Sequence, residues 1–221
     1  MDDYKILEAA RQGDLETVKQ LEVSISERLH SYYALFEAAK SGHLEVVKYL
    51  SAHRFPSIFL NAMDVAAGNG HLELVKWLHE HEKEGCTKHA IDSAAGNGHL
   101  EVVKFLHENR TEGCSQMASA VAAMNGNLEM LKYLHENGLS LPLDSLLPTA
   151  AGMERLEIIK YIHENGPEHD TGGWLSCWGV AVSERKEGVI KFMLENRRTA
   201  CNIKEGGDYV RGFLNEYLNE E

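Results

Sequence analysis

The chain has 221 residues, of which 43% are hydrophobic and 25% charged, and 22 basic against 34 acidic side chains give it a formal net charge of −12. This excess of acid argues against a surface that reads nucleic-acid phosphates, which requires clustered Lys and Arg, and it favours a partner with a basic or neutral surface. No stretch of about 18 apolar residues could span a membrane, and residues 1–5 lack the basic-then-apolar order of a signal peptide, so we expect an intracellular, cytoplasmic protein.

One stretch of sequence recurs along the whole chain. Residues 94–107 read Ala-Ala-Gly-Asn-Gly-His-Leu-Glu-Val-Val-Lys-Phe-Leu-His, and residues 66–79 repeat this string almost unchanged. Weaker copies begin at Ala9, Ala38, Ala122, Ala150 and Ala181. The step between equivalent glycines is constant from Gly42 to Gly70, Gly98 and Gly126 (70 − 42 = 28). A fixed period of this size predicts a solenoid, in which each unit buries its apolar face only against its neighbours.

These copies resemble the second half of the ankyrin repeat, which commonly reads Ala-Ala, two variable residues, Gly-His and then a Val-Val-Lys helix ending in leucines. The resemblance covers nearly the whole chain in about seven copies. The family's usual period is about 33 and its first helix usually opens with Thr-Pro-Leu-His, whereas residues 61–64 read Asn-Ala-Met-Asp and residues 89–92 read His-Ala-Ile-Asp. The resemblance therefore implies a short ankyrin variety: an all-α solenoid of helix-turn-helix repeats with reduced or absent β-hairpins.

The repeats divide the chain into one predicted ankyrin repeat domain, residues 1–221. We place the repeats at about 4–30, 31–56, 57–84, 85–112, 113–140, 141–170 and 171–200. The last segment, 201–221, carries a helical stripe of apolar residues and is predicted to be a capping half-repeat.

The turn inside each repeat is predicted from its glycine and the residue after it. Gly70 and its equivalents should end the first helix with a positive φ. The next residue, such as Asp14 or Asn127, should begin the second helix, because Asp and Asn side chains accept hydrogen bonds from free first-turn amides. The equivalent histidines, His43, His71 and His99, are implied by the ankyrin resemblance to bond the backbone of a neighbouring loop.

Acids in the first turn of each second helix are followed, in most repeats, by a lysine three residues later, which predicts ion pairs on a solvated outer face. The acids are Glu16, Glu45, Glu73, Glu101, Glu129 and Glu157, and the lysine column is Lys48, Lys76, Lys104, Lys132, Lys160 and Lys191.

The starts of the first helices are predicted from capping residues and prolines. Thr87 and Ser115 are predicted N-caps of the first helices. The residues by which this period is shorter than 33 should therefore be missing from the loop between repeats. In repeat 6, Pro142 and Pro148 should delay the first helix to about Asp144 or Ser145, where Pro148 falls in the tolerated first turn.

Two columns of residues on the second helices could carry chemistry. The histidines could form a metal ladder, but packing against the next repeat is expected, because one-repeat spacing is several times a zinc–nitrogen bond. The aromatic residues could stack on a ligand, but core or half-buried packing is favoured. The columns are His79, His107, His135 and His163, and Tyr49, Trp77, Phe105, Tyr133, Tyr161 and Phe192.

No catalytic residue, cofactor or metal site is predicted. His89, Asp92 and Ser93 lie within one short helical run without a nucleophile elbow, and Gly68-Asn69-Gly70 lacks the lysine and hydroxyl of a phosphate loop. The four cysteines, Cys86, Cys114, Cys177 and Cys201, are expected to be free thiols.

The sequence thus favours a non-enzymatic scaffold or adaptor that binds another protein on the concave face formed by its first helices, as the ankyrin resemblance implies. Trp174 and Trp178 break the repeat pattern, so they could pack in the core or cap, or serve as a binding hot spot. A structural spacer that associates through the irregular C-terminal repeat is one alternative, and a metal-binding or enzymatic protein that uses the histidine columns is another. The predicted partner-binding residues are Glu8, Arg11, Gln12, Glu37, Lys40, Ser41, Val65, Lys88, His89, Ser93, Gln116, Met117, Val121, Met124, Trp174 and Trp178.

Overall fold

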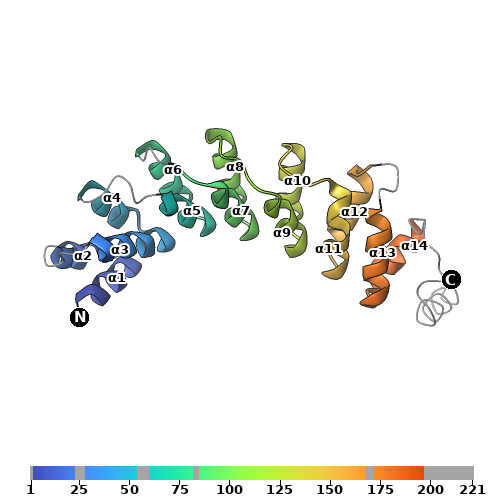
Figure 1. Cartoon of the computed structure of the whole chain (residues 1–221), viewed down its shortest axis with the longest axis horizontal. Coiled ribbons are helices and arrows are strands. Elements are labelled where there is room, and N and C mark those ends of the chain that lie inside the picture. Colours follow the sequence, from blue (N-terminus) through green and yellow to red (C-terminus); the bar gives the residue numbers. More distant parts are fainter. Residues whose placement is uncertain (1, 23–27, 54–59, 82–84, 168–171, 197–221) are drawn as a thin grey trace. The chain divides into compact units, whose positions relative to one another are not determined.

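The computed structural model describes residues 2–22, 28–53, 60–81, 85–167 and 172–196, and every regular element in these ranges is helical (Figure 1). The helices alternate between the first and second positions of the repeats, so the predicted all-α solenoid of helix-turn-helix repeats is confirmed, and no strand occurs in the described ranges. The helices pack into two compact units, Met1–Ala118 and Ser119–Glu221. The predicted capping half-repeat and Cys201 lie outside the described residues.

The N-terminal unit contains four complete helix pairs. They are α1 (Asp2–Gln12) with α2 (Leu15–Glu22), α3 (Arg28–Ser41) with α4 (Leu44–His53), α5 (Leu60–Gly68) with α6 (Leu72–His81), and α7 (Lys88–Gly96) with α8 (Leu100–Asn109). The boundary between the two units falls inside α9 (Met117–Asn125). Within the N-terminal unit the first helices pack against one another more extensively than the second helices do. Pairs of fully buried alanines, such as Ala66 and Ala67, permit this close approach.

The described part of the C-terminal unit holds the other helices. They are α10 (Leu128–Glu136), the short 3-10 helix η1 (Leu143–Leu146), α11 (Leu147–Gly152), α12 (Leu156–Asn165), α13 (Gly173–Ser183) and α14 (Glu187–Glu195). As predicted, the first helix of repeat 6 is delayed: η1 begins at Leu143, and α11 then starts with Pro148 in its first turn.

The turn inside each repeat is a Schellman motif, which satisfies two carbonyls at the end of the first helix. In repeat 3 the Gly70 amide donates to the Ala67 carbonyl at 3.0 Å and the His71 amide to the Ala66 carbonyl at 3.0 Å. Gly70 has a φ of +79°, and the predicted positive φ is likewise confirmed for Gly13, Gly42, Gly98 and Gly126. Glu154 and Arg185 adopt the same conformation in repeats 6 and 7, with φ of 55° and 56°.

Histidines at these turns join neighbouring repeats, as the ankyrin resemblance implies. The Nε2 of His43 donates to the Arg11 carbonyl at 2.8 Å, and the Nε2 of His71 donates to the Lys40 carbonyl at 2.9 Å. In the C-terminal unit an arginine takes this place, because Arg155 donates through Nε to the Met124 carbonyl at 3.0 Å. This exchange of histidine for arginine was not predicted.

The second helices have the predicted N-caps and the predicted Glu–Lys ion pairs. Asp14 accepts from the Thr17 amide at 3.0 Å, and Asn127 accepts from the Met130 amide at 3.1 Å. Hydrogen bonds from the Thr17 hydroxyl and amide favour the charged carboxylate and hold the pKa of Asp14 below the usual value. Ion pairs of 2.7–2.9 Å join Glu16 to Lys19, Glu45 to Lys48, Glu73 to Lys76, Glu101 to Lys104 and Glu157 to Lys160.

Candidate functional site

The predicted face of the first helices is accessible in the N-terminal unit. Lys40 on α3 and His89 and Ser93 on α7 are exposed, whereas Val65 on α5 is half-buried. Of the other predicted residues, Arg11, Gln12, Lys88, Gln116, Met117 and Met124 are exposed, and Glu8, Glu37, Ser41 and Val121 are half-buried. Val121 and Met124 belong to the C-terminal unit.

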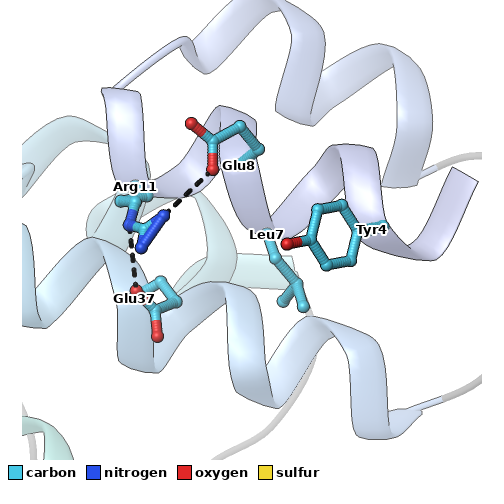
Figure 2. A pocket seen from close by; sticks show the side chains of 5 residues that line it. All are labelled: Tyr4, Leu7, Glu8, Arg11 and Glu37. Atoms are coloured by element: carbon cyan, nitrogen blue, oxygen red, sulfur yellow. Dashed lines mark hydrogen bonds and ion pairs between the residues drawn. The ribbon is translucent and has the colours of Figure 1, made fainter.

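One hollow on this face, here called the N-terminal hollow, lies between α1 and α3. Figure 2 shows its lining residues, which are Tyr4, Leu7, Glu8, Arg11 and Glu37. The Arg11 guanidinium lies 3.2 Å from a Glu8 oxygen and 3.7 Å from a Glu37 oxygen, so this hollow is polar on one side. Its other side is the Tyr4 ring, which is 78% exposed.

A second hollow, here called the central hollow, spans α3, α5 and α7 and has a volume of about 410 Å³. Its lining residues are Phe36, Lys40, Asp64, Val65, Gly68, Asn69, His89, Ser93 and Asn97. Its rim is held by two amides: the Asn97 Nδ2 donates to the Gly68 carbonyl at 2.6 Å, and the Asn69 Nδ2 donates to the Val65 carbonyl at 2.8 Å.

The loop that leads into α7 is tied to α5 beneath the central hollow. Both carboxylate oxygens of Asp64 accept from Thr87, one from its amide at 2.8 Å and the other from its hydroxyl at 2.6 Å. Thr87 in turn caps α7 by accepting from the His89 amide, which confirms its predicted role. Burial raises the pKa of Asp64, and the hydrogen bonds from Thr87 oppose this rise only in part.

The same connection recurs one repeat later. The Ser115 amide donates to Asp92 at 2.8 Å, and the Ser115 hydroxyl accepts from the Met117 amide at 3.1 Å, so the second predicted N-cap is confirmed. These side-chain bonds fix the loops between repeats without a strand, which gives a physical reason why the short period is tolerated.

We expect Asp64→Ala to lower the free energy of unfolding by about 2 kcal/mol, because it leaves the amide and hydroxyl of Thr87 unpaired in a half-buried place. Urea denaturation followed by far-UV circular dichroism measures this loss. Asp64→Asn is the matched control, because its amide can still accept from one Thr87 group and donate to the other. Equal losses for the two variants would contradict the proposed role of these bonds.

The histidine column packs edge-on against the aromatic ring of the next repeat. The ring centroids of His79 and Phe105 are 5.5 Å apart at 90°, and those of His163 and Phe192 are 5.7 Å apart at 87°. His135 Nδ1 also lies within hydrogen-bond distance of the Tyr161 hydroxyl, at 2.9 Å. Among the described residues, no group of three or more His, Cys, Asp or Glu side chains is arranged to hold a metal ion.

The described thiols are buried or half-buried and free of disulfides. Burial raises the pKa of the Cys86 thiol to about 11 and that of Cys177 to about 12. Reactive cysteines have a lowered pKa, so neither thiol has the character of a nucleophile.

The two predicted tryptophans do not lie on the accessible face. Trp174 and Trp178, both on α13, are only 3% and 2% exposed, which favours the packing alternative. The Trp174 ring lies edge-on to His163, with ring centroids 5.8 Å apart.

Two exposed tyrosines on the face were missed by the sequence reasoning. Tyr4 on α1 is 78% exposed and Tyr33 on α3 is 46% exposed. Each stands four residues before a predicted face residue, Glu8 and Glu37 respectively, as His89 stands before Ser93. Counting back through the repeat would therefore have identified them.

Stacked helix pairs with an accessible, hollowed first-helix face define this chain as an α-helical repeat protein. A family model for ankyrin repeats in three copies matches residues 6–92, and one for ankyrin repeats in many copies matches residues 91–135. Together they cover more than half of the chain, which belongs to the ankyrin repeat family. A search of curated proteins found no match.

Ankyrin repeats generally mediate protein–protein interaction and are typically non-enzymatic. No helix in the described part of the chain combines the length and hydropathy needed to cross a membrane.

Proposed function

We propose that this chain is a non-enzymatic adaptor that binds another protein through the first-helix face of its N-terminal unit. The observation that carries the proposal is the position of the two hollows. Both are lined by residues of the first helices and of the turns that end them, on α1, α3, α5 and α7. A partner that inserts side chains into such hollows gains contact area and specificity that a flat surface does not offer.

The contrast between the two sets of helices supports this assignment. The outer faces of the second helices repeat the same Glu–Lys pair, whose members already neutralise each other, as Glu73 and Lys76 do at 2.9 Å. The first helices instead present different chemistry at equivalent positions of repeats 2 and 4, where Tyr33 is replaced by His89 and Glu37 by Ser93. Varied side chains on a constant scaffold are what a specific partner requires.

A crosslinking pulldown tests this proposal with two variants of equal charge. The face variant combines Lys40→Glu with Ser93→Phe. The control combines Lys76→Glu with Gln20→Phe, which places the same changes on second helices. We expect the face variant to recover at least tenfold less crosslinked partner than the unaltered chain, and the control to recover the same amount. Equal recovery by the two variants would overturn the proposal.

A further inference from the structure

The central hollow is lined by a glycine at a position where other first helices carry a long side chain. Two residues before the turn, the first helices carry Arg11 and Lys40 in repeats 1 and 2, but Gly68 in repeat 3. A Cβ at Gly68 would lie 3.0 Å from the Cβ of Ser93, so α7 already approaches this glycine closely. Glycine at this position therefore lets Ser93 lie against α5, where Ser93 and Lys40 line the same hollow.

The exposed charged residue that lines this hollow is the base Lys40, although the chain as a whole carries a net charge of −12. Lys40 and His89 are both exposed. Among the lining residues the only acid is Asp64, which is half-buried and whose two oxygens accept from Thr87. Glu37, one turn before Lys40, faces Arg11 at 3.7 Å. In the described part of the chain, neither Lys40 nor His89 has a carboxylate within ion-pair distance.

We propose that the central hollow receives the carboxylate of an Asp or Glu side chain of the bound protein, with Lys40 as its counter-ion. This inference rests on the proposed function and names the chemistry that one part of the partner must present. The Ser93 hydroxyl and the His89 ring line the same hollow and can donate hydrogen bonds to this group. Phe36 and Val65, both half-buried lining residues, supply apolar contact for the methylene groups of the entering side chain.

The electrostatics favour an acid over a base at this place. A cationic side chain would approach Lys40 with Asp64 as its only acidic neighbour in the hollow, and Asp64 already accepts two hydrogen bonds. A carboxylate instead gains charge-assisted hydrogen bonds, which are about twice as strong as neutral ones and which strengthen when water is partly excluded. A partner whose overall surface is basic or neutral can still present one such acid.

The test is a selection from a phage-displayed library of random 12-residue peptides on the full chain. We expect the selected peptides to share an Asp or Glu whose replacement by Asn or Gln weakens binding to the unaltered chain about tenfold. On Lys40→Met, which keeps the aliphatic stem and removes the charge, the same peptide replacement should have no effect. Lys76→Met changes the net charge equally on a second helix and should leave the tenfold loss intact.

The outcomes separate this inference from the proposed function. Ser93→Phe fills the hollow with a neutral side chain, and its fold is checked by circular dichroism. Two results would overturn the carboxylate inference alone. In the first, the peptides lose binding to Ser93→Phe but contain no required acid. In the second, replacing the peptide's acid weakens binding to Lys40→Met as much as binding to the unaltered chain. Peptides that bind Ser93→Phe as tightly as the unaltered chain, or a selection that yields no peptide, would count against both proposals.

Discussion

Replacing Gly70 by alanine is expected to lower the free energy of unfolding by about 3 kcal/mol. The φ of +79° at this position costs a residue with a Cβ about 1–2 kcal/mol. In addition, that Cβ would lie 2.5 Å from Nδ1 of His99, whose ring lies over the glycine. The ring belongs to the next repeat, so moving it also disturbs the contact between two repeats. Urea denaturation followed by far-UV circular dichroism measures the loss.

Two further variants separate the backbone cost from the contact with His99. Gly113 also has a positive φ, +68°, but an added Cβ would meet nothing within 4 Å, so Gly113→Ala should lose only about 1 kcal/mol. Glu154→Gly relieves the same conformation in repeat 6 and should gain about 1 kcal/mol. Equal losses for Gly70→Ala and Gly113→Ala would show that the His99 ring adds nothing.

The turns could be predicted from sequence because they depend on local chemistry that recurs with the period. A glycine that is separated by two residues from a preceding Ala-Ala pair and is followed by Asp, Asn or His specifies a Schellman turn and the next helix start without any knowledge of distant residues. The constant 28-residue step then identifies the equivalent positions from Gly42 to Gly126. Glu154 could not be predicted in this way, because its φ of 55° is a conformation that a glutamate rarely adopts.

The hollows and the loop connections could not be predicted because they depend on residues from different repeats. Asp64 binds Thr87, which is 23 residues away, and the same separation joins Asp92 to Ser115. Such a spacing has no meaning until the stacking of the helices is known. The central hollow likewise requires Gly68 to lie beside Ser93, so the sequence indicated the face but not where it is open.

The tryptophans of repeat 7 show a different limit of sequence reasoning. A Trp side chain suits both a core and an interface because it combines a large apolar body with one polar atom. Its departure from the repeat pattern marked Trp178 as unusual but left both roles open. Only 2% of Trp178 is exposed in the structure, which favours the core role. The two roles predict different effects of its replacement.

Trp178→Ala is expected to lower the free energy of unfolding by about 3–5 kcal/mol, because it removes a large side chain from a packed core and leaves a cavity. Leu175→Ala is the matched control on the same helix, since Leu175 is 48% exposed and its truncation should cost less than about 1 kcal/mol. Urea denaturation followed by far-UV circular dichroism compares the two variants directly.

The packing and interface roles of Trp178 predict opposite pairs of results. If it packs in the core, Trp178→Ala is strongly destabilised, while the fraction that remains folded still recovers partner as the unaltered chain does. If it is an interface residue, the variant keeps its stability and loses partner in the crosslinking pulldown. The second pair of results would contradict the burial of the indole and would place part of the binding surface on α13. The first would leave the first-helix face of the N-terminal unit as the surface to test.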